Sequence, residues 1–169
     1  LSERGPIANR AEADVFVSVH CNDAGRNRAA NGAIVYYHMD SFACRALAES
    51  ISARLRSQVG AIRTQAPRSD STVYRNDGFA VLRTSQMAGV LVEAGFMSNA
   101  RDAAALRNPS VQRQIAGAVA RGIVDFLDAH PELNPRLVKP QKTRPDGLPV
   151  APGPETEPDG PPTFIGEER

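Results

Sequence analysis

The run ADVFVSVHCND, residues 13–23, decides the fold because it is the clearest strand in the chain. It is apolar almost throughout, which is typical of a strand buried on both faces of a sheet. Side chains alternate along a strand, so its three valines share one face, while Phe16, Ser18 and His20 share the other. The strand therefore ends on a histidine, where a polar turn begins.

A second apolar run, GVLVEAGF at residues 89–96, is interrupted by Glu93. In α/β sheets, ligands gather beyond the carboxyl ends of the strands, and His20 and Glu93 both lie at such ends. A buried carboxylate is costly unless it is paired or binds a metal. Burial also raises the pKa of a glutamate, which suits it to act as a general base.

Strand and helix patterns alternate around these two runs. GAIVYYH, residues 32–38, predicts a further strand. Apolar residues then recur every four positions, which predicts a helix from about Ser41 to Val59 that Gly60 ends. The order predicts an α/β fold: a mixed, mostly parallel sheet flanked by helices on both faces.

Two asparagines mark the starts of later helices. Asn99 is suited to cap a short helix over ARDAAAL, residues 100–106. Asn108 precedes a proline that suits the first turn of a longer amphipathic helix, which His130 is placed to close.

Residues 1–130 form the predicted single domain, and residues 131–169 a disordered tail or linker. From Pro140 the sequence is rich in proline, glycine and acidic residues with almost no apolar spacing. Such a segment cannot bury enough surface to offset the entropy lost on ordering.

The composition of the chain limits the classes of partner that it is expected to bind. The net charge is +1 and tryptophan is absent, so neither a global field nor stacking residues favour nucleic acid as a partner. No apolar run is long enough to be a transmembrane segment. Cys21 and Cys44 allow one disulfide, but two unpaired cysteines are the favoured interpretation.

Each candidate residue also has an ordinary structural interpretation. His20 alone fits a histidine at a strand end whose ring nitrogens hydrogen-bond to neighbouring groups. Glu93 alone fits a glutamate that forms an ion pair with an arginine such as Arg83. A thiol nucleophile at Cys21 activated by His20 is disfavoured, because adjacent strand residues point to opposite faces.

Longer strings carry more information than these single residues. RGPIANRAEADVFVSVHCNDA, GAIVYYH and VLRTSQMAGVLVEAGFMSNARDAAAL together resemble the zinc-dependent N-acetylmuramoyl-L-alanine amidases, over about residues 4–127. The resemblance implies a peptidoglycan hydrolase that cleaves the amide between the lactyl group of N-acetylmuramic acid and L-alanine. It also implies zinc (Zn²⁺) as cofactor, a periplasmic or extracellular location at the cell wall, and a possible activator protein.

The same resemblance assigns three site residues. His20, in an S-x-H-x-N motif, corresponds to a zinc ligand, and Glu93, in V-E-x-G-F, to the catalytic acid/base. Asn22 corresponds to a position that shapes the site or contacts substrate. Zinc-activated water would attack the carbonyl while Glu93 moves the proton.

The chain departs from the family pattern at its beginning. Full-length members open with an H-x-G strand and a helix bearing a glutamate, which supply the other two zinc ligands. We therefore expect a catalytic domain that is N-terminally incomplete, lacks its first strands and is inactive alone. The alternative is an inactive amidase-like peptidoglycan-binding or regulatory module that has lost its metal. The interval Gly60–Ala88 is also too short and polar to carry the long helix that blocks the zinc in some members.

Overall fold

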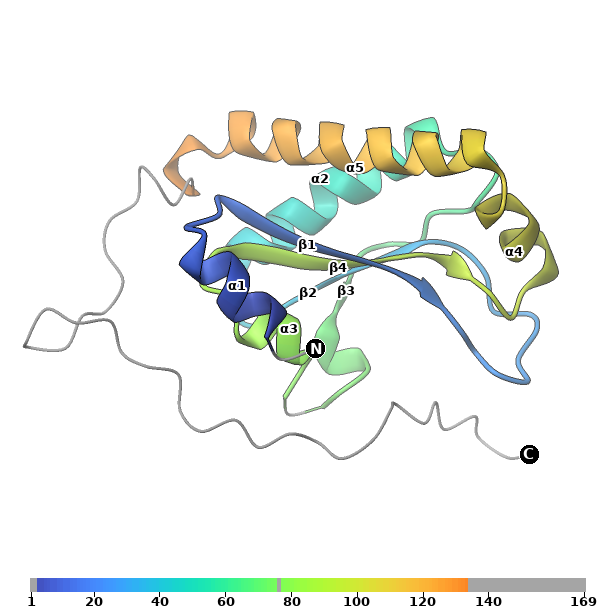
Figure 1. The fold of residues 1–169 in the computed structure, drawn as a ribbon, viewed down its shortest axis with the longest axis horizontal. Helices are drawn as coiled ribbons and strands as arrows, with labels where there is room; N and C mark the ends of the chain where they lie inside the picture. The colour runs from blue at the N-terminus through green and yellow to red at the C-terminus, as the bar shows by residue number, and fades with distance from the viewer. Residues whose placement is uncertain (1–2, 76, 134–169) are drawn as a thin grey trace, which may run out of the picture.

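A four-stranded sheet organises the described part of the chain (Figure 1). The structure is a computed structural model, and it describes residues 3–75 and 77–133. The strand order is β1-β4-β2-β3, with parallel pairing of β1 to β4 and of β2 to β3, and antiparallel pairing of β2 to β4. The strands are β1 (Val15–Asn22), β2 (Ile34–Tyr37), β3 (Arg68–Ser69) and β4 (Ala88–Phe96). The predicted mixed, mostly parallel sheet is confirmed.

Helices cover both faces of this sheet, as predicted (Figure 1). α2 (Phe42–Gln58) and α5 (Pro109–Ala129) lie together on one face. α1 (Arg4–Arg10) and α3 (Ala80–Arg83) lie on the other, and α4 (Ala100–Leu106) follows the end of β4. Two 3-10 turns, η1 (Asp70–Thr72) and η2 (Pro131–Leu133), complete the elements of the described residues. The predicted tail lies outside the described residues from residue 134 onward.

The predicted helix boundaries are confirmed by their caps. The side-chain oxygens of Ser41, Asn99 and Asn108 accept hydrogen bonds from backbone amides in the first turns of α2, α4 and α5. At the other ends, α2 stops just before Val59 and Gly60, and His130 is the C-cap of α5. These local polar contacts satisfy amides that have no partner inside a helix.

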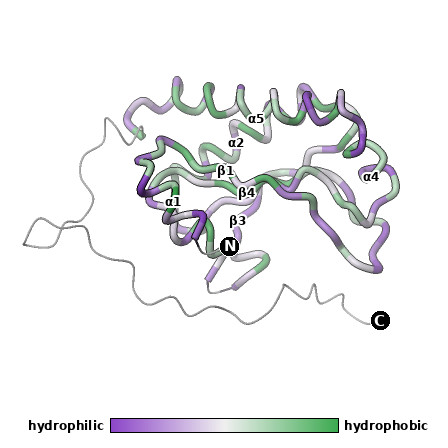
Figure 2. Tube along the Cα trace, viewed as in Figure 1, coloured by the Kyte–Doolittle hydropathy of each residue, from purple (hydrophilic) through white to green (hydrophobic). Residues whose placement is uncertain are grey.

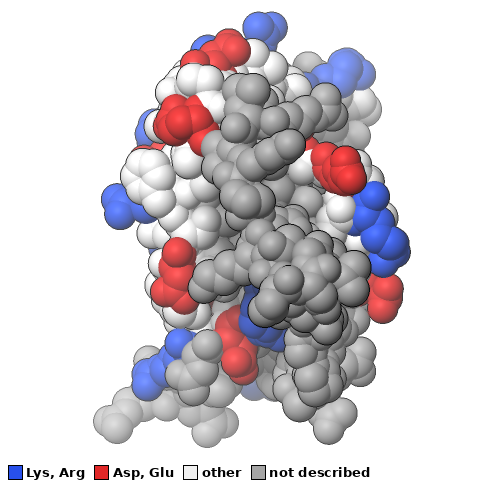
Figure 3. All heavy atoms as spheres, turned by 90° about the vertical axis from the view of Figure 1, so that its left-hand side faces the viewer, with Lys and Arg blue, Asp and Glu red and all other residues white. Residues whose placement is uncertain are grey.

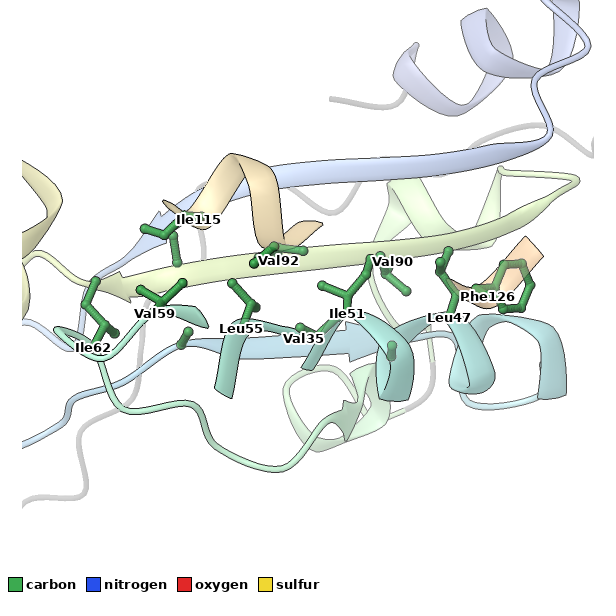
Figure 4. Close-up of a cluster of buried hydrophobic side chains, with 14 of the residues drawn as sticks. Val35, Leu47, Ile51, Leu55, Val59, Ile62, Val90, Val92, Ile115 and Phe126 are labelled. Atoms are coloured by element: carbon green, nitrogen blue, oxygen red, sulfur yellow. The ribbon is translucent and has the colours of Figure 1, made fainter. Parts of the chain in front are cut away.

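The main core lies between the sheet and the α2–α5 pair (Figure 4). Its side chains come from α2, from the two central strands and from α5, and the tube in Figure 2 is mostly green or white along β4 and its neighbours. The labelled members are Val35, Leu47, Ile51, Leu55, Val59, Ile62, Val90, Val92, Ile115 and Phe126. The two helices approach closely at Gly122, where an added Cβ would lie 2.6 Å from the Ile51 Cα atom.

A smaller core lies on the opposite face of the sheet. It contains Ile34, Tyr36, Val81, Leu82, Leu91 and Phe96, with Phe16 packed against it. The alternation predicted for the first strand is confirmed, because Val15 and Val17 pack against the main core while Phe16 packs here.

β1 is less buried than its composition predicts. Val15, Phe16 and Val17 are only half-buried, and Val19 is 57% exposed. The expectation of a strand buried on both faces is therefore wrong, because β1 is an edge strand that pairs with β4 alone among the described strands.

Two sequence predictions about smaller features are also settled. Cys21 is exposed and Cys44 is buried, and both are free thiols, in agreement with the favoured interpretation. Among the described helices, none is long and apolar enough to cross a membrane.

Candidate functional site

The strand register brings His20 and Glu93 together. They are direct partners in the parallel pairing of β1 with β4. Partners across a pair point to the same face of a sheet, and neighbouring strands lie about 4.8 Å apart. Two residues more than 70 positions apart in sequence therefore form one constellation on the face opposite α2 and α5.

Glu93 is a carboxylate held without a partner. It is half-buried, and its Oε2 atom is fully buried with no hydrogen-bond partner. Burial raises the pKa of Glu93 from 4.5 to about 7. The alternative of an ion pair with Arg83 is not seen, because the Arg83 guanidinium donates to the Asp77 carbonyl and no salt bridge between described residues includes Glu93. A carboxyl that titrates near neutrality can both accept and return a proton.

His20 has one ring nitrogen engaged. Its Nε2 atom lies 2.8 Å from the Ser18 hydroxyl oxygen, two residues earlier on the same face. Burial, and then the positive charge of Arg4, lower the pKa of His20. The neutral imidazole is thereby favoured, and this is the form that binds metals.

Asn22 lies just beyond His20, after an irregularity in the β1–β4 register. It is only 6% exposed, and its side-chain oxygen accepts a hydrogen bond of 2.8 Å from the Asp23 amide. Its carbonyl accepts a 2.7 Å bond from the Met97 amide. The bond from Met97 joins the end of β1 to the turn after β4, and the bond from Asp23 fixes the Asn22 side chain locally.

The described residues do not provide a whole metal site. Across residues 3–75 and 77–133, no group of three or more His, Cys, Asp or Glu side chains could hold a metal ion. A catalytic zinc takes three protein ligands and one water, whereas His20 offers one imidazole. The donor set that is present therefore does not fit zinc by itself.

Three neighbours of the site were not found from the sequence. Ser18 binds the ring of His20, and the charge of Arg4 acts on that ring. Burial raises the pKa of the Tyr36 hydroxyl on β2, the positive charge of Arg68 lowers it, and the charge of Glu93 raises it. Ser18 carries a signal in retrospect, because it is two positions from His20 on one strand face, whereas Arg4 and Tyr36 come near only through tertiary packing.

The segment between α2 and β4 bears on whether a helix covers the site. The interval between α2 and β4 contains only β3, η1 and the four-residue α3 among its described elements, so the prediction that it carries no long blocking helix is confirmed there. A pocket of about 350 Å³ lies beside the free edge of β1, lined by α1 and by residues 16–19. In the view of Figure 3, basic and acidic side chains are interspersed over the described surface.

Cysteine chemistry has no support at this place. Cys21 is next to His20 in the chain, but burial and the charge of Glu93 both raise the pKa of its thiol. A raised pKa disfavours the thiolate, which is the nucleophilic form.

Known proteins share this chain's sequence and fold. The N-acetylmuramoyl-L-alanine amidase family matches residues 1–125. The amidase LytC of Bacillus subtilis is 34% identical over 128 residues, which are 75% of this chain and 24% of LytC. The chain thus spans about a quarter of the length of that relative.

Solved structures agree with the sequence match. The amidase AmiC2 of Nostoc punctiforme superposes with a TM-score of 0.67 at 34% identity, covering 76% of this chain and 66% of AmiC2. The CwlD amidase of Clostridioides difficile, solved in complex with the GerS lipoprotein, gives 0.66 at 26% identity, covering 75% and 60%. The match over most of the chain and the shared fold show that this chain belongs to the N-acetylmuramoyl-L-alanine amidase family.

Proposed function

We propose that this chain serves a peptidoglycan hydrolase that cleaves the amide between the lactyl group of N-acetylmuramic acid and L-alanine. The observation that carries the proposal is the pairing of His20 with Glu93, whose buried Oε2 atom has no partner and whose pKa is raised to about 7. Membership of the amidase family supports the same activity.

In the proposed mechanism Glu93 is the general acid/base. It takes a proton from the attacking water and delivers it to the departing nitrogen of L-alanine, which completes the hydrolysis. Its pKa near neutrality suits both steps.

His20 would supply one ligand of a zinc ion, and Ser18 would hold its ring in place. The remaining ligands would have to come from outside the described residues, because these contain no further donor cluster. Asn22 would shape the substrate side of the site through its bonds to Asp23 and Met97.

Location and partners follow from the substrate. Peptidoglycan lies outside the cytoplasmic membrane, so the enzyme would act in the periplasm or at the cell exterior. Because CwlD was solved in complex with the GerS lipoprotein, we include a protein partner, an activator, in the proposal for this chain.

The test is digestion of purified peptidoglycan by the complete gene product, of which these 169 residues are the whole or a part. We expect release of peptides with a new L-alanine amino terminus. Glu93→Gln should lower kcat about 10²- to 10⁴-fold with unchanged zinc content, because only the proton transfer is removed. His20→Ala should lower both kcat and the zinc content. Full activity of Glu93→Gln would refute the assigned role.

The second candidate is a peptidoglycan-binding module without a metal, which the lack of a donor cluster in the described residues favours. The same assay separates the two candidates. A complete gene product that sediments with peptidoglycan but releases no peptide and holds no zinc would establish the binding module. Zinc content of the 169-residue chain, with His20→Ala as control, shows how much of the ligand set this chain supplies.

A further inference from the structure

Three segments meet at the end of the sheet where β1 and β4 stop, and they carry an excess of positive charge (Figure 1). Residues 23–32, 60–63 and 97–107 together contain five arginines against two aspartates, whereas the whole chain has a net charge of only +1. The arginines are Arg26, Arg28, Arg63, Arg101 and Arg107, and all five are exposed. This end of the molecule is therefore a local basic surface, which favours an anionic ligand.

Neither aspartate forms an ion pair with these arginines. Asp102 is 3% exposed, and its Oδ2 atom accepts hydrogen bonds from the amides of Gly32 at 2.6 Å and Phe96 at 3.0 Å. Asp23 accepts a hydrogen bond of 2.7 Å from the Gly25 amide. No salt bridge between described residues includes either aspartate or any of the five arginines. The two carboxylates thus bind the backbone, and the positive charges remain for a ligand.

A pocket of about 260 Å³ lies among these segments. Arg63 and Arg101 both line it, together with Asn31, Asn99 and the buried Asp102. Within the part of the chain that the structure describes, no hydrogen bond or ion pair engages the side chain of either arginine. Two arginines from different segments therefore border one concave space with their hydrogen-bond donors unused.

The backbone on both sides of the pocket is held in place. The Arg63 carbonyl accepts a hydrogen bond of 2.7 Å from the Ala33 amide. Gly32 has a φ of +96°, and an added Cβ would lie 2.6 Å from the Arg63 carbonyl oxygen, so this close approach requires glycine. Across the pocket, the Arg101 amide donates a hydrogen bond of 3.1 Å to the side-chain oxygen of Asn99. Because the segments are already ordered, less entropy is lost when a ligand binds.

We propose that this pocket binds a phosphate group of a soluble or polymeric ligand through Arg63 and Arg101. The oxygens of a phosphate point in tetrahedral directions, so arginines on two walls can bind the same group. A carboxylate has two oxygens in one plane, which a single guanidinium fork already occupies. The pocket is concave and suits one group, whereas a membrane surface needs a broad basic face. Neither Glu93 nor His20 lines it, so the inference does not depend on the proposed function.

The experiment is a calorimetric titration of the complete gene product with inorganic phosphate, with dimethyl phosphate as a diester, and with acetate as a carboxylate. We expect at least one of the two phosphates to bind about 10-fold more tightly than acetate, and which one binds distinguishes a monoester from a diester. Arg63→Gln and Arg101→Gln should each weaken that binding about 10- to 100-fold, as the loss of one charge-assisted hydrogen-bonded pair predicts. Arg63→Lys should retain part of the affinity, because it keeps the charge without the planar fork.

Arg10→Gln is the matched control, because Arg10 is an exposed arginine on α1, at the other end of the sheet from α4 (Figure 1). It removes the same charge and should leave phosphate affinity unchanged. An equal loss in Arg10→Gln would show that net charge rather than the pocket attracts the anion, and would overturn the inference. Phosphate binding no tighter than acetate binding would overturn it as well. So would binding to phosphatidylglycerol vesicles without binding to either soluble phosphate.

Discussion

The two faces of the sheet differ in what they bury. The face under α2 and α5 is lined by aliphatic side chains and Phe126, which are almost completely buried. The opposite face carries a smaller cluster, which includes Tyr36, beside His20 and Glu93, and it leaves one carboxylate oxygen of Glu93 without a partner. The same strands thus serve two purposes. The apolar packing on the first face stabilises the fold and offsets the free-energy cost of burying ionisable side chains on the second face.

The largest effect is expected when a buried side chain is removed from the first face. Phe126→Ala deletes a completely buried ring and should lower the free energy of unfolding by about 3–5 kcal/mol. Phe42→Ala is the control, because Phe42 is 70% exposed and should cost less than about 1 kcal/mol. Urea unfolding followed by circular dichroism measures both. Equal losses would show that the α2–α5 face is not the stabilising one.

A smaller effect is expected where α5 contacts α2. Gly122→Ala places a methyl group 2.6 Å from the Ile51 Cα atom, so the helices must separate at a cost of about 1–3 kcal/mol. Gly117→Ala on the same helix has no atom within 4 Å of the added Cβ and should instead stabilise by about 0.5–1 kcal/mol. In the same urea experiment, a lower free energy of unfolding for Gly122→Ala and a higher one for Gly117→Ala would confirm the close approach of the helices. A higher free energy of unfolding for both variants would contradict it.

The smallest effect concerns pH on the second face. The folded-state pKa of Glu93 is about 7, raised from 4.5, so between these values the folded protein binds more protons than the unfolded chain. This contribution to stability is full below pH 4.5 and is lost as the pH rises through 7. We expect a loss of about 1–2 kcal/mol, because solvent screens part of the shift.

Glu93→Gln removes the titration, so its free energy of unfolding should fall less than that of the wild type between pH 4.5 and 7.5. Glu49→Gln, an exposed glutamate on α2, should follow the wild type. Identical pH dependence in the wild type and Glu93→Gln would mean that the carboxylate is not destabilised by burial.

Much of the fold follows from short-range patterns. The spacing of Leu47, Ile51 and Leu55 predicts α2, and asparagines at positions 99 and 108 predict the starts of α4 and α5. These features depend on residues within a few positions of each other, so the sequence contains them directly. The positions of His20 and Glu93 on strands could be predicted for the same reason, but the expectation that they end these strands is wrong, because β1 continues to Asn22 and β4 to Phe96.

Sequence patterns were less informative where neighbours come from distant segments. The composition of β1 predicts burial on both faces, yet Val19 is exposed because strand order leaves β1 at the edge of the described sheet. The sequence left an ion pair between Glu93 and Arg83 as an alternative. Only the tertiary structure shows that the Arg83 guanidinium donates to the Asp77 carbonyl instead.

The sequence by itself determined α2, α4 and α5, their caps, the two ionisable residues on apolar strands and the family resemblance, since each depends on residue type and local spacing. The tertiary structure alone decided that His20 lies beside Glu93, that Ser18 binds the histidine ring, and that Tyr36 is a diagonal neighbour of Glu93. The physical reason is register. Pairing between strands that are distant in sequence sets which side chains become neighbours, and that pairing is fixed only when the two cores pack.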